Sequence, residues 1–376
     1  MPWKAFSMSE SRTAFVSLVR SQTVTLAEAC RQFAISRKTG YKWLHRASDP
    51  SPQPLVDHSR RPRTSPARTP ADLEQAILQL RQQYGWGARK IRALLGQQQT
   101  GVPSTRTITA VLRRHHQITP RPMAVRPPLQ PFERAAPNEL WQVDFKGPLE
   151  FHRDKFYLFD VLDDHSRYAL GCELVGDKSM ATAWNFLWQL FGEVGLPEMI
   201  LCDNAFAATG NTGLSWFDAQ LIRLDIRPAH GRPYHPQTQG KIERWHGTLE
   251  TEAFPRLSRD QPATFAAALR RWRTEVYNAV RPHEALGDVA PITRWRPSPR
   301  RRPATLPLVE YPSGAVLRKV MQKGEISWRN CEILVGAGLR GEWVCVEENE
   351  GMVQVRYSWK QIRSLPVDQL RKRAIV

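Results

Sequence analysis

Three carboxylates stand in sequence contexts that suit metal-dependent chemistry. Asp144 lies within the strand-like run WQVDFKG, Asp203 directly follows the apolar run EMILC, and Glu243 lies on a predicted helix 40 residues later. The apolar neighbours of Asp144 predict burial, and a buried carboxylate is costly unless a cation compensates its charge. Carboxylates that converge from two strands and a helix can hold two hard divalent ions. Such a site activates water or a 3′-hydroxyl for in-line attack on a phosphodiester and stabilises the leaving oxygen.

Other catalytic chemistries lack their sequence motifs. The chain has no GxSxG nucleophile motif and no GxxxxGK[ST] phosphate loop, and its five cysteines show no CxxC or paired Cys/His spacing. Asp163 and Asp164 are rivals to Asp144, but their segment DDHSR is typical of a turn at a strand end. Glu250 shares a helical stripe with Glu243 and lies roughly 10 Å further along the helix axis, too distant to replace it.

Alternation of apolar and polar residues predicts the strand that carries Asp144. Trp141, Val143 and Phe145 fall on one face of this strand, and Gln142 and Asp144 fall on the other. Further strands are predicted at about 156–162, 168–175, 198–202 and 224–229. An apolar helix is predicted around Trp184, Leu187, Trp188 and Phe191, and further helices from 240 onward and over 262–280. A sheet covered by helices, with acidic residues at strand ends, is an α/β domain with a site along that edge.

Residues 11–47, with three short helical stretches, predict a helix-turn-helix module. Thr25 and Glu28 form a capping box, and Ser36 can cap a following helix that places Tyr41 and Leu44 inside. The exposed start of that helix would then enter a major groove. Its predicted DNA contacts are Arg37, Lys38, Thr39 and Lys42. A generic three-helix bundle is the alternative interpretation.

A basic Pro/Ser-rich linker and a second module follow. The linker, 51–68, is predicted to follow DNA backbone through Arg60, Arg61 and Arg63. Thr69 is predicted to cap the next helix, with Pro70 at its first position. A later helix begun by Ser104 has Ile108, Val111 and Leu112 inward and is predicted to present Arg106 and Arg113 to DNA.

The net charge of +18 favours a polyanionic partner. Residues 1–138 hold 22 basic and 7 acidic residues, 139–290 hold 16 and 21, and 291–376 hold 16 and 8. Two basic regions therefore flank an acidic middle region. An enzyme that binds DNA phosphates with cations and holds a metal ion with carboxylates needs this distribution of charge. A solvated basic surface is the alternative interpretation of this charge.

Five segments resemble the bacterial insertion-sequence transposases with a retroviral-integrase-like DDE core. In family order they are WQVDFKG (141–147), DVLDDHSRY (160–168), LCDNA (201–205), YHPQTQGKIERWHGTLE (234–250) and YNAVRPHEAL (277–286). Two departures affect the loop geometry: Ala205 replaces the usual glycine, and GNTGLSWF lengthens the segment before Glu243.

The resemblance implies a ribonuclease-H-like fold in which Asp144, Asp203 and Glu243 are the catalytic metal ligands. They are expected to hold two Mg²⁺ ions, with Mn²⁺ as a substitute. Lys241 and Arg244, which flank Glu243, are expected to approach DNA phosphates.

The chain as a whole is predicted to be multidomain. Its parts are all-α helix-turn-helix modules at 1–50 and 69–118, linkers at 51–68 and 119–138, an integrase-like core at 139–292, and a basic linker with a small C-terminal β-barrel at 293–376. The expected partner is double-stranded DNA, at the element ends and at the target, bound by a homo-oligomer. We expect no membrane partner and no small-molecule substrate.

The predicted function is a transposase that binds terminal inverted repeats and transfers their 3′-hydroxyls into target DNA. No apolar run long enough for a membrane span or signal peptide is present, which predicts a cytoplasmic protein. The resemblance implies a bacterial protein associated with the nucleoid. Two alternatives stay open: a sequence-specific DNA-binding regulator derived from a transposase, and a metal-dependent nuclease without joining activity.

Overall fold

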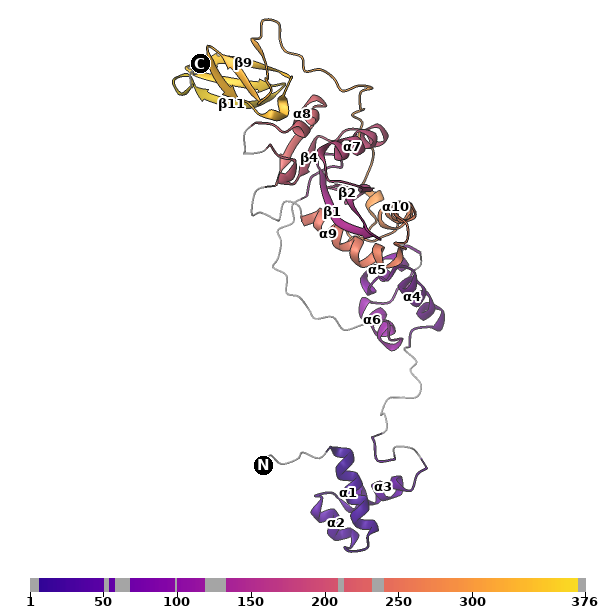
Figure 1. Cartoon of the computed structure of the whole chain (residues 1–376). Helices are drawn as coiled ribbons and strands as arrows, with labels where there is room; N and C mark the ends of the chain where they lie inside the picture. The colour runs from indigo at the N-terminus through magenta and orange to yellow at the C-terminus, as the bar shows by residue number, and fades with distance from the viewer. Residues whose placement is uncertain are drawn as a thin grey trace. The chain divides into compact units, whose positions relative to one another are not determined.

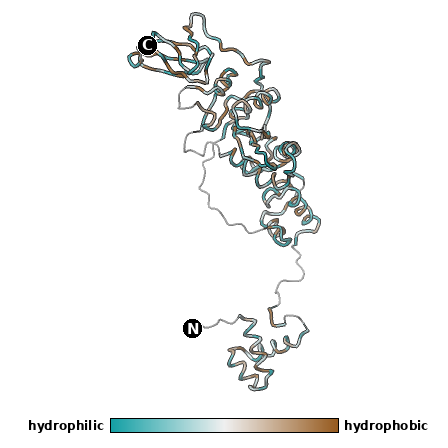
Figure 2. Tube along the Cα trace, in the orientation of Figure 1, coloured by the Kyte–Doolittle hydropathy of each residue, from teal (hydrophilic) through white to brown (hydrophobic). Residues whose placement is uncertain are grey.

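The chain folds into two compact units, Met1–Arg68 and Thr69–Val376. The structure is a computed structural model and describes residues 7–50, 54–57, 68–98, 100–118, 133–208, 213–231 and 240–370. Figure 1 shows the helices and strands of both units. In Figure 2, hydrophobic and hydrophilic residues alternate along the helices and strands, as expected of elements with one buried face.

The first unit is a three-helix module. Its helices are α1 (Met8–Arg20), α2 (Leu26–Gln32) and α3 (Arg37–Ala47), and the predicted caps form: Thr25 with Glu28, and Ser36 at the start of α3. Phe15, Cys30 and Trp43 belong to its core. The prediction that Tyr41 points inward is wrong, because the helix phase that buries Trp43 leaves Tyr41 64% exposed.

A glycine lets α3 approach α1 and α2 closely. A Cβ at Gly40 would lie 2.7 Å from the Cys30 sulfur and 3.0 Å from the Phe15 ring. Ala34, in the turn between α2 and α3, has a φ of 52°, in the left-handed region. The tight turn and the close approach together produce the helix-turn-helix arrangement.

The second unit begins with another three-helix module. Its helices are α4 (Ala71–Tyr84), α5 (Ala88–Gln98) and α6 (Thr105–Arg114). Pro70 stands at the N-cap of α4 without a side-chain hydrogen bond, so the prediction of a Thr69 cap is wrong. Ser104 caps α6 as predicted, and Ile108, Val111 and Leu112 are buried.

A five-stranded mixed sheet forms the centre of the second unit. Its strands are β1 (Trp141–Phe151), β2 (Asp154–Asp163), β3 (Ala169–Val175), β4 (Met199–Cys202) and β5 (Arg227–His230), in the order β3-β2-β1-β4-β5. The pairs β1–β2 and β2–β3 are antiparallel, and the pairs β1–β4 and β4–β5 are parallel. All the predicted strands therefore form, although β5 lies slightly later than expected.

Helices cover both faces of this sheet. Trp141 and Val143 belong to a hydrophobic cluster with α7 (Met180–Val194) and α8 (Trp216–Arg223). A second cluster joins the sheet to α9 (Gly240–Thr248) and α10 (Pro262–Arg271). The predicted alternation along β1 therefore holds: its apolar face packs on α7 and α8, and its polar face lies toward α9. Each helix of the second pair continues into a π-helical turn, Leu249–Ala253 after α9 and Trp272–Asn278 after α10.

The C-terminal region contains six short strands. They are β6 (Leu317–Lys319), β7 (Glu325–Trp328), β8 (Cys331–Leu334), β9 (Trp343–Asn349), β10 (Met352–Tyr357) and β11 (Lys360–Pro366). They pair as an open sheet, β11-β10-β9-β6, and a separate hairpin, β7-β8. The predicted closed barrel is not confirmed, because closure requires an unbroken ring of paired strands and the described pairs leave the hairpin outside the sheet.

The basic stretch before these strands runs along the core. The hydroxyl of Ser298 donates to the carbonyl of Leu196 at 2.6 Å, and the ring of Trp295 stacks on Tyr168 with centroids 4.1 Å apart. Further on, Leu214 and Ile222 share a hydrophobic cluster with the C-terminal strands. The strands therefore pack against the α8 side of the core. Within the described ranges, no helix is long and apolar enough to span a membrane.

Candidate active site

Asp144 and Asp203 meet where two parallel strands run side by side. The last pairs between β1 and β4 are Trp141 with Ile200 and Gln142 with Leu201. Asp144 lies two residues further along β1, and Asp203 directly follows the end of β4. The charge of Asp203 raises the pKa of Asp144. The structure thus brings together the two aspartates that the sequence predicted as metal ligands.

Asp144 lies in an environment that penalises its negative charge. Burial, opposed by His246 and reinforced by Asp203 and Asp160, raises the pKa of Asp144 from 3.8 to about 6. One oxygen accepts a hydrogen bond from the backbone N–H of Phe145 at 2.8 Å. The side chain nevertheless stays 23% exposed, so the carboxylate remains accessible. A cation bound beside it would compensate the buried charge.

Glu243 lies on the helix that follows the polar face of β1. The backbone N–H of Ile242 donates to Gln142 at 3.3 Å, and Lys146 pairs with Glu250 at 2.5 Å, so α9 and the turn after it lie along β1. Residues three or four apart share a helix face, which places Glu243 on the same stripe as His246 and Glu250.

The third predicted carboxylate, Glu243, does not lie in one cluster with Asp144 and Asp203. Glu243 is exposed, and across the described ranges no three His, Cys, Asp or Glu side chains lie close enough together to hold a metal ion. The structure therefore pairs Asp144 with Asp203 and leaves Glu243 on the neighbouring helix.

A histidine and a further aspartate border the site, and the sequence did not predict either. Asp160 is fully buried and stands opposite Asp144 across the β1–β2 pair. It accepts hydrogen bonds from Trp245 at 2.8 Å and from His246 at 3.0 Å. The other ring nitrogen of His246 lies 3.9 Å from Asp144. Asp160 thus positions the imidazole beside the candidate metal ligand.

A second histidine, His230, contacts the backbone of Asp203. The Asp203 side chain accepts from the N–H of Ala205 at 3.0 Å and caps a short 3₁₀ turn, while the carbonyl of Asp203 lies 3.3 Å from His230. The other nitrogen of His230 contacts Asp218 at 2.9 Å. Burial would lower the pKa of His230, but its bond to Asp218 outweighs this and raises it. Replacing the usual glycine by Ala205 has left this turn intact.

Asp163 and Asp164, the alternative candidates for the metal ligand on this strand pair, are bound by other groups of the protein. Asp163 accepts from Ser166 and from the backbone N–H of Asn138, as expected of a turn. Asp164 is fully buried and pairs with Lys241 at 2.6 Å. Lys241, predicted to contact DNA, is therefore engaged by a carboxylate here.

The predicted DNA contacts divide into described and undescribed residues. Arg37, Lys38 and Lys42 are exposed on α3, while the Thr39 hydroxyl lies 2.9 Å from that of Ser36. Exposed arginines are also found on α6 and α9, namely Arg106, Arg113 and Arg244. Arg60, Arg61 and Arg63 fall outside the described residues, as does the segment 232–239 before Glu243.

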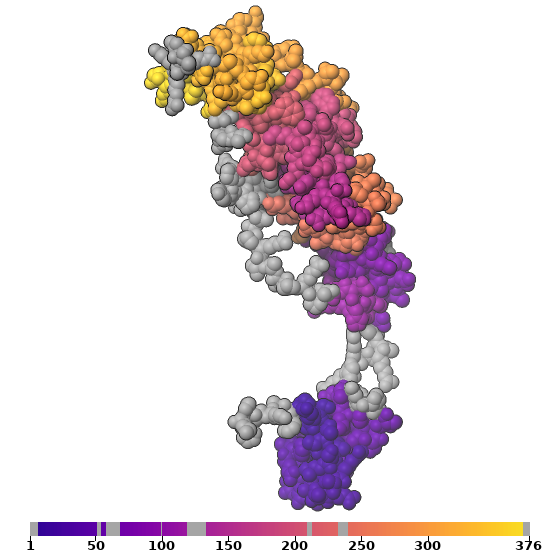
Figure 3. Space-filling view, viewed as in Figure 1, coloured from indigo at the N-terminus to yellow at the C-terminus, as the bar shows by residue number. Residues whose placement is uncertain are grey.

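A largely buried carboxylate joins the second module to the core. Glu252 accepts from Trp86 at 2.8 Å and Lys90 at 2.5 Å of the module, and from Arg281 at 2.8 Å. Burial would raise the pKa of Glu252, but the bonds and charges of Arg281 and Lys90 lower it to about 2. Val276 also packs against the module's hydrophobic cluster. Figure 3 shows the two parts in contact.

Comparison with known families identifies the domains. Two integrase core domain models match residues 134–236 and 224–291. A helix-turn-helix domain model matches residues 11–63, and a homeodomain-like domain model matches 39–112. The core and the helical region predicted from the sequence are therefore confirmed as an integrase core and helix-turn-helix DNA-binding domains.

Individual relatives are similar to most or to part of this chain. The chain is 24% identical over 364 residues to a protein of Geobacillus stearothermophilus assigned as the transposase for insertion sequence element IS5376, covering 93% of this chain and 85% of the relative. It is 32% identical over 115 residues to the Gag-Pro-Pol polyprotein of simian retrovirus SRV-1, of which it spans 6%.

Two solved structures are also similar. A chain of the simian T-cell lymphotropic virus intasome is 20% identical, with a TM-score of 0.36 over 80% of this chain and 99% of that chain. The HTLV-2 integrase catalytic core domain in complex with magnesium is 18% identical, with a TM-score of 0.30 over 43% of this chain and 97% of that chain.

Proposed function

We propose that this chain, a transposase built from helix-turn-helix DNA-binding domains and an integrase catalytic core, acts on the terminal inverted repeats of a bacterial insertion sequence. It cleaves the DNA at those ends and joins the freed 3′-hydroxyls to target DNA. The observation that carries this proposal is the proximity of Asp144, within β1, to Asp203, directly after β4, beside the helix of Glu243.

Asp144, Asp203 and Glu243 would hold Mg²⁺, with Mn²⁺ able to substitute. All the donor atoms are oxygens, as hard divalent ions require. A bound ion would also compensate the negative charge of Asp144, which burial makes unfavourable. Two bound ions would activate the attacking oxygen and stabilise the leaving one. Because Glu243 is exposed at the start of α9, it is free to turn toward the aspartates when metal and DNA arrive.

The residues around the carboxylates orient them. Asp160 holds the ring of His246 next to Asp144, and Asp218 holds the ring of His230 against the backbone of Asp203. These contacts restrict the positions of the reacting groups, and that restriction is a large part of catalysis in phosphoryl transfer.

The helix-turn-helix domains would supply sequence recognition. In the first unit, Arg37, Lys38 and Lys42 form an exposed basic start of α3, the helix placed to read the major groove. Joining both ends of an element at one target requires both ends in one complex. We therefore propose that a homo-oligomer of this chain assembles on DNA, in the nucleoid of a bacterial cell.

A strand-transfer assay tests the proposal. The full chain is incubated with Mg²⁺, labelled terminal-repeat duplex from the DNA that brackets this reading frame, and a target plasmid. Joined products are expected for the wild type, and none for Asp203→Asn or Glu243→Gln, which remove a hard metal ligand without changing shape.

Glu250→Gln is the matched control, because Glu250 lies on the same helical stripe and should be dispensable. Joining by Glu243→Gln, or its loss in Glu250→Gln alone, would contradict the assignment of Glu243. Specific binding by the wild type without cleavage would indicate a regulator, and cleavage without joining would indicate a nuclease.

A further inference from the structure

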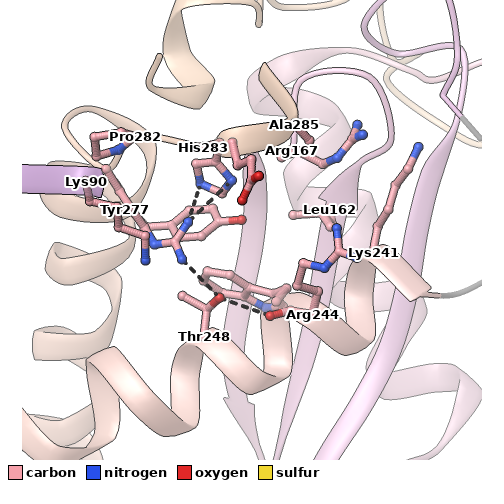
Figure 4. A pocket seen from close by; sticks show the side chains of 13 residues that line it. Lys90, Leu162, Arg167, Lys241, Arg244, Thr248, Tyr277, Pro282, His283 and Ala285 are labelled. Carbon is pink, nitrogen blue, oxygen red and sulfur yellow. Dashed lines mark hydrogen bonds between the residues drawn. The ribbon is translucent and has the colours of Figure 1, made fainter. Parts of the chain in front are cut away.

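A basic pocket of about 410 Å³ lies between the second helix-turn-helix module and the core. The segment YNAVRPHEAL, residues 277–286, builds one wall with Tyr277, Arg281 and His283, and α9 builds the other with Lys241 and Arg244. Lys90 enters from α5. Figure 4 shows Lys241 and Arg244 facing Lys90, Tyr277 and His283 across the pocket.

The lining carries more positive than negative charge. Five cations line the pocket: Lys90, Arg167, Lys241, Arg244 and Arg281. Three carboxylates pair with four of them: Glu252 with Lys90 and Arg281, Asp164 with Lys241, and Glu133 with Arg167. The one acidic residue in the lining itself, Glu284, pairs with Arg89, which lies outside it. The pocket therefore keeps an excess of positive charge.

Arg244 is the cation best placed to bind an added anion. Its side chain is exposed, and within the described residues no ion pair holds it. Figure 4 shows it on α9 at the edge of the pocket, next to Thr248. On the opposite wall, burial and the charges of Arg281 and Lys90 lower the pKa of His283 to about 2, so the imidazole is neutral.

The walls that carry these cations are held firmly. Arg281 is 8% exposed and is fixed by Glu252 at 2.8 Å and by Thr248 at 3.5 Å. Its guanidinium also lies 3.0 Å from a ring nitrogen of His283. A binding site whose cations are fixed before the ligand arrives loses less entropy on binding.

We propose that this pocket binds one backbone phosphate of the DNA that the second module recognises. Arginine and lysine side chains in convergent arrangement bind phosphate oxygens strongly. In a helix-turn-helix pair the helix before the recognition helix crosses the DNA backbone, and α5, which carries Lys90, has that place before α6. The bound phosphate would then set the distance between the DNA sequence read by α6 and Glu243, the neighbour of Arg244.

This inference rests on the proposed function, and a phosphate-by-phosphate binding experiment tests it. Terminal-repeat duplexes are prepared with one phosphate at a time replaced by a neutral methylphosphonate, and their affinity for the full chain is measured by fluorescence anisotropy. For the wild type, one position in the segment bound by the second module should weaken binding about tenfold, the factor that 1.4 kcal/mol represents.

The variant Arg244→Gln should be insensitive to methylphosphonate at that one position and should respond like the wild type elsewhere. Arg271→Gln, which removes an exposed arginine of α10 away from the pocket, should keep the wild-type pattern. If Arg244→Gln weakens binding to every duplex equally, Arg244 supplies only general attraction and the proposal is wrong.

Two further arms separate the other outcomes. Inorganic phosphate is compared with chloride at equal ionic strength by thermal unfolding of the wild type and Arg244→Gln. Stabilisation through Arg244, without any sensitive position in the duplex, would assign the pocket to a free phosphate instead. If the wild type joins strands but no methylphosphonate position weakens its binding, only the proposal of a phosphate-binding pocket is wrong. If the wild type neither binds nor joins DNA, the proposed function is wrong as well.

Discussion

Replacing Asp144 by asparagine should stabilise the metal-free protein at neutral pH. Because burial raises the pKa of Asp144 from 3.8 to about 6, ionising it in the folded chain costs about 3 kcal/mol more than in the unfolded chain, at 1.36 kcal/mol per pH unit. Asparagine removes that charge and keeps an oxygen to accept the hydrogen bond from Phe145. Since water reaches part of the side chain, we expect a gain of about 1–3 kcal/mol.

Because the pKa of Asp144 is raised in the folded chain, the stability difference between wild type and Asp144→Asn should depend on pH. Below pH 3.8 the carboxyl of Asp144 is protonated in both folded and unfolded chains, so wild type and Asp144→Asn should be equally stable. From pH 3.8 to about 6 the unfolded chain loses its proton first, and the wild type loses stability relative to the variant. Above about pH 6 the difference should be constant.

Urea unfolding of the full chain after chelation, over a series of pH values, measures this difference. Added Mg²⁺ should then stabilise the wild type and not the variant, because only the wild type keeps the ligand. Glu250→Gln is the control: Lys146 lowers the pKa of Glu250, so its loss should not stabilise the protein. If Asp144→Asn is less stable than the wild type at pH 7.5, the negative charge of Asp144 does not destabilise the metal-free protein and the reasoning is refuted.

Three further changes have defined outcomes. Glu252→Gln should lower the free energy of unfolding by about 3 kcal/mol at neutral pH, because it leaves buried cations without their counter-charge. That loss should shrink as pH falls from 4.5 toward 2, where the wild-type carboxyl itself protonates, and a pH-independent loss in urea unfolding would contradict this. Gly40→Ala should destabilise the first unit by about 1–3 kcal/mol, followed by Trp43 fluorescence, because the added methyl would lie 2.7 Å from the Cys30 sulfur. Arg37→Ala should weaken binding to terminal-repeat duplex about tenfold in anisotropy and to random duplex much less, and an equal loss on both would mean a phosphate contact.

Local pattern was sufficient to predict the positions of the two aspartates. The alternation along 141–145 put Asp144 on the polar face of its strand, and the short apolar run before Asp203 marked the end of another. In the structure β1 and β4 are parallel neighbours, so Asp144, within β1, and Asp203, directly after β4, lie at the same level of the sheet. Parallel pairing therefore brought a carboxylate within one strand and a carboxylate at the end of another into one candidate site.

Residues that depend on distant packing could not be predicted in the same way. Asp160 lies in an apolar strand run, and its role follows only from α9 bringing Trp245 and His246 across the sheet. Glu252 and Lys90 are separated by 162 residues, so no local pattern links them. Closure of the C-terminal strands is likewise a matter of which distant strands pair, which alternation along a single strand does not specify.

Each DNA-binding module carries a different degree of evolutionary independence. The first module's hydrophobic cluster draws on residues of its own unit, such as Phe15 and Trp43, so recombination near Arg68 would exchange a complete fold for another. The second module shares its cluster with Val276 of the core and grips Glu252. Under the proposed function, an element that acquires new terminal repeats could exchange its first module in one step, whereas its second module would change by point substitution at exposed positions such as Arg106.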